Sequence, residues 1–342
     1  MTNAASGLPF DDIRKLVAEL PGPDQDAVAA CRAREGQLTK PPGALGRLEN
    51  LTEWLCAWQA QHPPKAERVV VAVFAGNHGV VAQNVAAYPQ EVTTQMVANF
   101  QNNGAAVNQI CKSFDLGLKV FELALEKPTR DITEDAALEE AECAATMAYG
   151  MEATEGCDIL CIGEMGIGNT TIAAAICHGL FGAEPRDWVG PGTGVDSKGV
   201  ERKADAIRRA VALHRAHLKD PLEVLRRLGG RELAAMAGAV LAARLQRIPV
   251  VLDGYVATAA AAVLFAMRPD ALEHCVAGHL SAEPAHRRLL DKLGLKPILE
   301  LGMRLGEGSG AAMAAGILKT AANLHNGMAT FVSAGVSNKQ EE

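Results

Sequence analysis

The sequence predicts an α/β protein with a doubly wound, mainly parallel sheet that is flanked by helices. Three observations favour this class. Apolar runs typical of buried strands alternate with helical segments, several of these runs end in glycine-rich turns that carry polar groups, and no segment resembles a flexible linker. In sheets of this kind, ligands bind at the carboxyl ends of the strands. We therefore expect a site at that edge.

Composition and charge narrow the class further. Apolar residues make up 49% of the 342 residues while aromatic residues make up only 4%, which suits close packing of helices on a sheet better than a β-sandwich. The net charge of −7, without a run of like charges, argues against a nucleic-acid surface. No signal peptide is expected at the N-terminus, and the longest apolar stretch, 249–267, carries Asp253 and Gly254, so a membrane span is not expected either.

The eight cysteines are scattered along the chain and none forms a C-x-x-C pair. The two nearest in sequence, Cys157 and Cys161, lie in a predicted buried strand. This pattern favours reduced core cysteines in a soluble, cytoplasmic protein over disulfides or metal ligands.

The N-terminal residues 1–66 are expected to form a helical arm. Helical periodicity covers 11–20, 24–38 and 44–61, and a rigid turn with two prolines lies at 39–43. We expect this arm to pack with C-terminal helices into a small domain beside an α/β catalytic domain of residues 67–330. Residues 331–342 are expected to form a C-terminal tail with a frayed polar end.

Strands and helices are expected to alternate through the catalytic domain. Buried strands are predicted at 68–75, 118–123, 158–162 and 249–252, and a weaker candidate covers 273–277. Helices are predicted at 91–102, 104–114, 136–154, 172–180, 198–218, 222–228, 232–245, 256–267 and 309–322.

The first strand ends in the turn Gly76-Asn77-His78-Gly79. A single histidine after a buried strand is compatible with a structural role and with a functional one. The sequence leaves both open for His78.

A glycine-rich turn, GEMGIGNTT at 163–171, follows the third strand and precedes a helix. Backbone N–H groups at such a helix start, together with hydroxyl groups and small glycines, are typical of a phosphate site. The glycine spacing is not that of a dinucleotide fold, and no Gly-Lys-Ser/Thr follows as in a P-loop. The turn therefore predicts phosphate binding by Gly166, Gly168, Asn169 and Thr170, with the class of nucleotide open.

A second glycine-rich loop, GPGTG at 190–194, contains Gly192 and Gly194 and precedes a helix with basic residues. Lys203 on that helix could reach an anion held by the loop, or it could be a solvated surface charge. The sequence alone does not separate the two readings.

The segment GHLSAEPAH contains His279, Ser281, Glu283 and His286. This grouping could hold a metal ion. The proline at position 284 instead favours a helix start with Ser281 as N-cap and an acid in the first turn. We expect the helix start and no metal.

The segment LGMRLGEGSGAA places Glu307 between Gly306 and Gly308, ahead of a helix of small residues. The flanking glycines indicate left-handed backbone or close approach to a ligand. Glu307 could cap its own helix. Alternatively, the helix N–H groups could keep its carboxylate ionised, so that it can accept a proton from a substrate.

Taken together, these segments resemble the nicotinate-nucleotide–dimethylbenzimidazole phosphoribosyltransferase family from about residue 36 to residue 330. The resemblance rests on TKPPGALGRLE, FAGNHGV, AYPQEVT, GEMGIGNTT, GPGTG, DGYVATAAA, SAEPAHRRLL and LGMRLGEGSGAA. It implies transfer of ribose 5-phosphate from nicotinate mononucleotide to 5,6-dimethylbenzimidazole in cobalamin biosynthesis. The products would be nicotinate and α-ribazole 5′-phosphate, with inversion at the anomeric carbon. It also implies a homodimer and no cofactor or metal.

The resemblance assigns roles to particular residues. Glu307 matches the catalytic base, and the loop from Glu164 to Thr171 and Lys203 match substrate-site positions. The apolar base needs a flat pocket, for which we choose Tyr88, Met96, Met165 and Leu305, and Ser281 is added to the substrate site. Many relatives have aspartate at Asn77 and arginine at Pro191, so any substrate contacts of those groups are changed here.

Two other functions compete with this one. A Rossmann-type NAD-dependent enzyme is disfavoured by the glycine spacing. A non-catalytic protein that binds benzimidazole or nucleotide would differ mainly in the role of Glu307. The preferred base and the roles of His78, His279 and His286 are not determined by the sequence.

Overall fold

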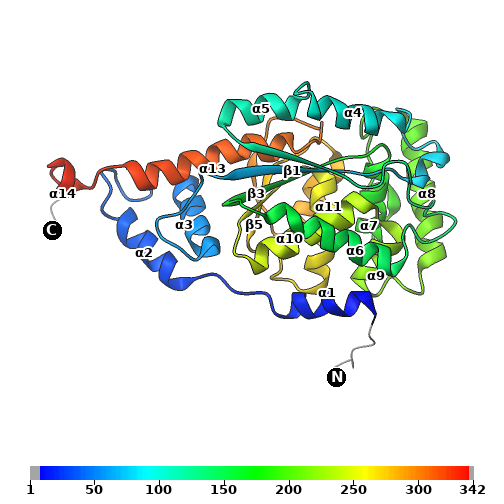
Figure 1. Cartoon of the computed structure of the whole chain (residues 1–342), viewed down its shortest axis with the longest axis horizontal. Coiled ribbons are helices and arrows are strands. Elements are labelled where there is room, and N and C mark those ends of the chain that lie inside the picture. Colours follow the sequence, from blue (N-terminus) through cyan, green and yellow to red (C-terminus); the bar gives the residue numbers. More distant parts are fainter. Residues whose placement is uncertain (1–7, 339–342) are drawn as a thin grey trace.

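The computed structural model describes residues 8–338 and contains one six-stranded parallel sheet (Figure 1). The strand order is β2-β1-β3-β4-β5-β6. The strands are β1 (Val69–Ala75), β2 (Gly117–Glu122), β3 (Ile159–Met165), β4 (Val250–Leu252), β5 (Cys275–His279) and β6 (Pro297–Leu299). The predicted parallel, doubly wound α/β class is confirmed, whereas β6 has no counterpart among the predicted strands.

The strand order reverses between β1 and β3. These two strands pair in parallel from Val69 opposite Ile159 to Ala75 opposite Met165, so they end side by side. A reversal of this kind leaves a crevice outside the carboxyl ends of the strands, because the connections leave in opposite directions.

Helices cover both faces of the sheet. The elements are α2 (Gln25–Glu35), α3 (Arg47–Gln59), α4 (Glu91–Gln101), α5 (Ala106–Phe114), α6 (Glu140–Met151), α7 (Asn169–Phe181), α8 (Ser197–His214), α9 (Pro221–Leu228), α10 (Arg231–Leu245), α11 (Tyr255–Met267), α12 (Pro284–Leu293), α13 (Ser309–Gly327) and α14 (Phe331–Ala334). In Figure 1, α4, α5 and α13 lie on one side of the sheet and α6, α7, α10 and α11 on the other.

The two faces enclose two hydrophobic cores. Alternate residues of β1 divide between them: Phe74 joins the core under α6, α7, α10 and α11, and Val73 joins the core under α3, α5 and α13. Both side chains are fully buried. This two-sided burial explains why the strand has a continuous apolar run instead of an alternating pattern.

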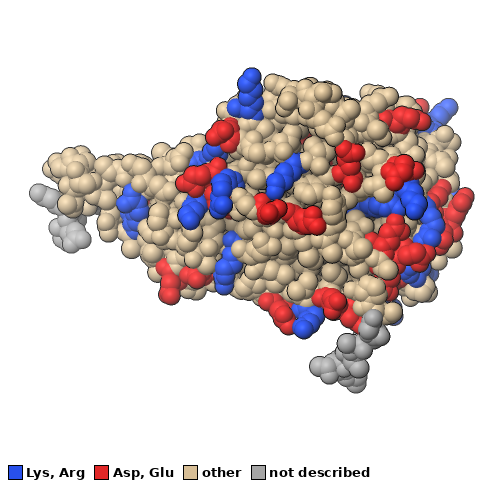
Figure 2. All heavy atoms as spheres, viewed as in Figure 1, with Lys and Arg blue, Asp and Glu red and all other residues tan. Residues whose placement is uncertain are grey.

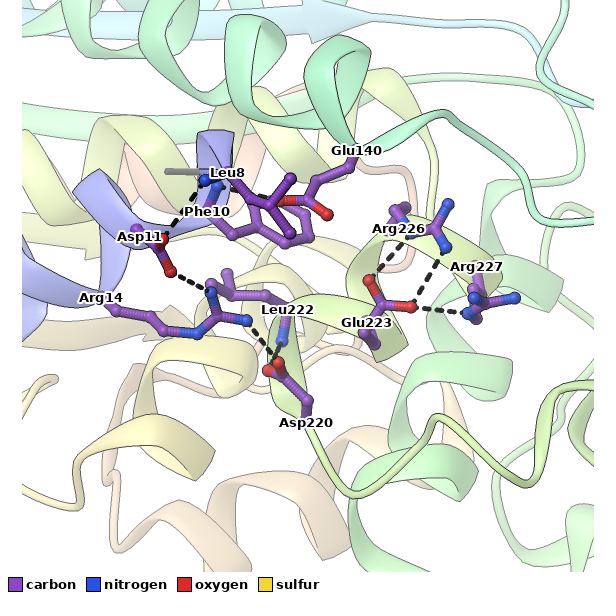
Figure 3. A network of polar contacts seen from close by, with 10 residues as sticks. All are labelled: Leu8, Phe10, Asp11, Arg14, Glu140, Asp220, Leu222, Glu223, Arg226 and Arg227. Atoms are coloured by element: carbon purple, nitrogen blue, oxygen red, sulfur yellow. Dashed lines mark hydrogen bonds and ion pairs between the residues drawn. The ribbon is translucent and has the colours of Figure 1, made fainter. Parts of the chain in front are cut away.

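The first helix, α1 (Pro9–Ala18), is attached to the α/β part of the molecule (Figure 3). Its Phe10 is fully buried in the same core as the sheet, and the Phe10 N–H donates to Glu140 at the start of α6 over 3.2 Å. Arg14 forms an ion pair of 2.6 Å with Asp220, the N-cap of α9, but this pair is partly exposed and contributes little. Burial of apolar side chains, at roughly 1.5–3 kcal/mol each, therefore holds α1 in place.

The rest of the N-terminal arm lies elsewhere. Helices α2 and α3 pack together, and α3 packs on α13, whose C-terminal half projects from the sheet (Figure 1). Thr52 of α3 donates to the Ala321 carbonyl over 3.2 Å, and Leu38 forms a bridge with Thr330. The domain division at residues 66 and 330 stays a prediction, although α1 and α2 lie against different parts of the molecule.

Several predicted boundaries move. The helix expected over 136–154 begins at Glu140 and ends in a short 3₁₀ segment, Glu152–Thr154, and the helix expected over 198–218 ends at His214. Part of the tail expected at 331–342 forms α14, and residues 339–342 lie outside the described residues, as do residues 1–7 of the segment assessed for a signal peptide.

Within residues 8–338, no helix combines the length and apolar character that a membrane crossing requires. On the face seen in Figure 2, basic and acidic side chains are interspersed, and no basic stripe runs across that face.

Candidate functional site

Two neighbouring hollows open at the carboxyl ends of the strands. The first, here called the inner cavity, is formed by the ends of β3, β4 and β5 and the loop before α13. Eight residues proposed from the sequence line it: Glu164, Met165, Gly166, Asn169, Thr170, Gly192, Ser281 and Leu305. Four of them carry polar side chains and two are glycines, as suits a phosphate-bearing ligand.

The second hollow, here called the outer cleft, lies between the loop before α13 and α4. Its volume is ≈ 550 Å³, and it is lined by Tyr88, Val92, Met96, Met165, Ile167, Thr193, Arg304, Leu305 and Glu307. Five of these residues come from the sequence-based choice. Met165, Ile167, Thr193, Arg304 and Leu305 line both hollows and form a common wall. A small apolar ligand in the cleft would therefore lie beside a ligand in the cavity.

Three residues chosen from the sequence line neither hollow. Gly168 is the left-handed N-cap of α7, with φ of 92°, and Gly194 shapes the end of its loop with φ of 123°. Lys203 lies directly behind the inner cavity, in contact with Thr170.

Glu307 is presented by a strained turn. Gly306, Glu307 and Gly308 all have positive φ, at 86°, 61° and 75°. A Cβ on Gly163 of β3 would stand 2.2 Å from the Gly308 nitrogen, so the turn lies directly on the strand backbone. The expected left-handed backbone is confirmed, and for Glu307 itself it is an uncommon conformation of the kind found at functional sites.

The Glu307 carboxyl is buried, with 6% exposure, and its Oε2 has no hydrogen-bond partner among the described residues. Burial, followed by the negative charge of Asp253, raises the pKa of Glu307 to about 7. The expectation that the following helix stabilises the ionised form of this carboxyl is wrong, because its pKa is raised and not lowered. The alternative of a helix cap is wrong as well, because Gly308 is the N-cap of α13. The carboxyl instead holds its proton more tightly than a free glutamate.

Asp253, and not Glu307, accepts the N–H groups at the start of α13. Its carboxylate, 1% exposed at the end of β4, accepts the N–H groups of Gly308 (3.1 Å) and Ala311 (2.9 Å) at the start of α13. These charge-assisted bonds satisfy helix N–H groups that would otherwise lack partners. Asp253 thereby fixes the Glu307 turn and also places a negative charge near Glu307.

Lys203 is almost fully buried, with 2% exposure, so it is not a solvated surface charge. Its ammonium group donates to the Thr170 hydroxyl (3.0 Å) and to the Gly190 carbonyl (3.2 Å). Burial lowers the pKa of Lys203 to about 8, and the negative charge of Glu283 opposes this shift. The two glycine-rich segments therefore meet around one buried cation.

Glu283 and Arg304 hold the second glycine-rich loop from its other side. The Gly192 N–H donates to Glu283 over 3.1 Å, and Arg304 donates to the Gly192 carbonyl over 2.8 Å. Burial raises the pKa of Glu283, and the charge of Lys203 opposes that shift. Both residues line the inner cavity.

Glu164 connects the first loop to the Glu307 turn. Its carboxylate accepts a hydrogen bond from Asn169, and its carbonyl accepts the Glu307 N–H over 3.2 Å. Burial and the charge of Asp253 raise the pKa of Glu164 to about 8. Three neighbouring acids therefore lie at this edge of the sheet: Glu164, Asp253 and Glu307. The carboxyl pKa of each is raised.

Of the three histidines whose roles the sequence leaves undetermined, two have structural contacts. His78 is fully buried and pairs with Glu232 over 2.6 Å. His286 uses both ring nitrogens, one with the Thr258 hydroxyl (3.0 Å) and one with the Ser281 N–H (2.9 Å), so neither is free to ligate a metal. His279 lines the inner cavity.

The predicted helix start near Ser281 is two residues late in the structure. Helix α12 begins at Pro284 with Glu283 as its N-cap, because Ser281 instead accepts the Glu283 N–H over 3.2 Å in a tight turn. Ser281 therefore faces the inner cavity rather than capping a helix. In the part of the chain that the structure describes, no group of three or more His, Cys, Asp and Glu residues is arranged to hold a metal ion.

The two positions that depart from the family pattern lie outside both hollows. Asn77 donates to the Leu125 carbonyl over 2.9 Å behind β1. The Pro191 carbonyl accepts the N–H groups of Gly194 and Val195 and closes the glycine-rich loop on itself.

Sequence reasoning missed Asp253 behind the Glu307 turn, and it missed three residues in the cavity wall, Glu283, Arg304 and Thr193. The DGY segment after β4 was a usable signal for Asp253, because it places an acid at the end of a buried strand. The contacts of Glu283 and Arg304 join distant segments and had no local signal.

Comparison with known proteins now identifies the class. A family model described as Phosphoribosyltransferase matches residues 20–336. The chain belongs to this phosphoribosyltransferase family.

The names of individual relatives specify the reaction more closely than the family model does. The nicotinate-nucleotide–dimethylbenzimidazole phosphoribosyltransferases of Sinorhizobium medicae and Rhizobium meliloti are each 65% identical to this chain, over 98% of it and 99% and 100% of their own lengths. A crystal structure of the enzyme of that name from Thermus thermophilus superposes with a TM-score of 0.84 at 41% identity, covering 92% of this chain and 100% of that one.

Proposed function

We propose that this chain transfers ribose 5-phosphate from nicotinate mononucleotide to 5,6-dimethylbenzimidazole, releasing nicotinate and forming α-ribazole 5′-phosphate for cobalamin biosynthesis. One observation carries the proposal. A buried carboxyl group, Glu307, lies where an apolar cleft adjoins a polar cavity backed by a buried lysine. The names of the relatives support the same reaction.

The mononucleotide occupies the inner cavity. Its phosphate lies against the first turn of α7, near Thr170, with the charge of Lys203 directly behind that hydroxyl. Helix N-termini favour anions through their free N–H groups and dipole. Holding the phosphate fixes the ribose, and orientation of this kind contributes several kcal/mol to catalysis.

The benzimidazole occupies the outer cleft. Tyr88, Met96, Met165 and Leu305 supply apolar surface for a flat ring, and Glu307 supplies a polar end. The ring would lie beside the ribose in the cavity, because the two hollows share lining residues.

Glu307 acts as the general base. Nicotinate departs as a neutral pyridine nitrogen from a positively charged glycosidic linkage, so it needs no proton. The attacking benzimidazole nitrogen forms the new C–N bond while the N–H proton of its ring passes to the Glu307 carboxylate. A base with a pKa of about 7 is well matched to neutral pH, and general-base help is worth roughly 10²–10⁴-fold.

The two hollows also account for the stereochemistry. Nicotinate leaves from the β face of the anomeric carbon, whereas the base attacks from the opposite face. Separate hollows on either side of a common wall suit this inversion.

The reaction is tested by incubating the protein with nicotinate mononucleotide, with and without dimethylbenzimidazole, and identifying the products by chromatography and NMR. We expect nicotinate release that depends on the benzimidazole and a product with an α-glycosidic bond. Binding of both compounds without product would favour the non-catalytic alternative. Binding of NAD with hydride transfer would favour the Rossmann-type alternative, although the strand order here differs from the 3-2-1-4-5-6 order of that fold.

The chain acts in the cytoplasm as a homodimer, without a nucleic-acid or membrane partner. Exposed apolar side chains near its C-terminal end, Val332 at 93% and Val336 at 49%, support a second copy as partner. Sedimentation equilibrium should give twice the mass of one chain, and a monomer at micromolar concentration would contradict this state.

A further inference from the structure

His279, the last residue of β5, is an exception among the buried histidines of the described chain. It is 1% exposed, and neither of its ring nitrogens has a hydrogen-bond partner among residues 8–338. The other buried histidines there, His78, His214, His274, His286 and His325, each make at least one hydrogen bond. Buried polar groups are almost always paired, and leaving one unpaired is costly, so this exception calls for an explanation.

Packing fixes the ring of His279 in one place. A Cβ on Gly310, in the first turn of α13, would stand 2.0 Å from the imidazole Cδ2, so only glycine fits there. A Cβ on Gly254 would lie 3.5 Å from the ring Nε2, so Gly254 is also close to the ring. The ring is therefore held in position before any ligand arrives.

The ring lies in the wall of the inner cavity, which Ser281 and Glu283 also line. Its Nε2 is 3.7 Å from the Asp253 carboxylate, which is too far for a hydrogen bond. An imidazole ring always carries at least one N–H group. A ring that bears an N–H donor is suited to an oxygen acceptor.

We propose that a ring nitrogen of His279 donates a hydrogen bond to an oxygen of the ribose 5-phosphate part of the bound mononucleotide. This inference rests on the proposed function, because it places that substrate in the inner cavity. The N–H donor of His279 is then hydrogen-bonded only in the complex with the mononucleotide. In the free protein the donor stays unpaired, and the bond it gains on binding strengthens the binding of the substrate.

The substitution His279→Phe tests this role, because phenylalanine keeps a ring in the packed position and removes both nitrogens. We expect its affinity for nicotinate mononucleotide, measured by calorimetry, to fall about 10-fold or more, while the KM for dimethylbenzimidazole changes little. The melting temperature should stay equal or rise, since an unpaired buried polar group is removed. His279→Asn, which restores an N–H donor, should recover part of the affinity for nicotinate mononucleotide. This second variant also tests the proposal if phenylalanine does not fit in the packed position.

His286→Phe is the matched control for stability. His286 is equally buried but both of its nitrogens are bonded, so its replacement should lower the melting temperature. If His279→Phe also lowers the melting temperature by as much and leaves the affinity for the mononucleotide unchanged, His279 is structural and the inference is wrong.

Two simpler probes separate the possible acceptors. If inorganic phosphate and ribose 5-phosphate both bind more weakly to the His279→Phe protein than to wild type, the acceptor is a phosphate oxygen. If only ribose 5-phosphate binds more weakly, the acceptor is a ribose hydroxyl, and equal binding of both probes overturns the inference. Failure of the wild-type protein to bind nicotinate mononucleotide would refute the proposed function and this inference together.

Discussion

The substitution Glu307→Gln removes the charge of the proposed base while keeping its size, and it should stabilise the free protein at alkaline pH. The pKa of this carboxyl is raised from 4.5 to about 7, first by burial and then by the charge of Asp253. The folded state therefore holds the proton more tightly than the unfolded chain does. The resulting stability is fully present below pH 4.5 and is lost as pH rises through about 7.

The size of the effect follows from the shift. Above the folded pKa, ionised Glu307 costs the folded protein roughly 3 kcal/mol, at about 1.4 kcal/mol per pH unit. Because glutamine resembles the protonated acid, the variant avoids this cost. For a chain of this length the gain corresponds to a melting temperature about 4 °C higher.

Differential scanning calorimetry at pH 5 and pH 8.5 measures this difference. We expect the two proteins to melt at similar temperatures at pH 5 and the variant to melt higher at pH 8.5. Glu126→Gln, on an exposed turn, is the control and should show no such pH dependence. Two results would refute the account of the buried carboxyl. One is a Glu307→Gln melting temperature below that of wild type at pH 8.5, and the other is a difference in melting temperature that is the same at both pH values.

Three further substitutions test the assignments around Glu307. Lys203→Ala should raise the KM for nicotinate mononucleotide at least 10-fold and leave that for dimethylbenzimidazole nearly unchanged, because its ammonium group lies behind Thr170, which lines the inner cavity and not the outer cleft. Equal effects on both KM values would make Lys203 structural. Tyr88→Ala should do the reverse, with a several-fold higher KM for the benzimidazole alone in steady-state kinetics. Asp253→Asn should move the acid limb of the kcat/KM profile from about pH 7 toward 4.5, because the charge that raises the Glu307 pKa is lost while burial remains. A limb that stays at pH 7 in this variant would remove Asp253 from the account.

Much of the fold could be predicted because its strands are locally encoded. The run at β1 is apolar on both faces, and it is buried on both faces in the structure. The edge strand β6 could not be predicted in this way, since it has only three residues, begins with proline and is half-buried. Its pairing with β5 depends on tertiary context rather than on its own pattern.

The candidate site was predicted in its parts but not in its electrostatics. Glycines on either side of Glu307 indicated the left-handed turn, and GPGTG beside Lys203 indicated a cation near the loop. The sequence could not show that Asp253 takes the N–H groups of α13, because that contact joins residues 55 and 58 positions apart. The raised pKa of Glu307, which burial causes first and the charge of Asp253 second, could not be predicted from the local pattern either.

The central claim is that Glu307 accepts the benzimidazole proton during ribosyl transfer. The most direct test compares wild type and Glu307→Gln for nicotinate release in the presence of dimethylbenzimidazole, alongside calorimetric binding of nicotinate mononucleotide. We predict that the variant binds the mononucleotide within a few-fold of wild type and turns over roughly 10²–10⁴-fold more slowly. A variant with undiminished turnover would contradict the claim.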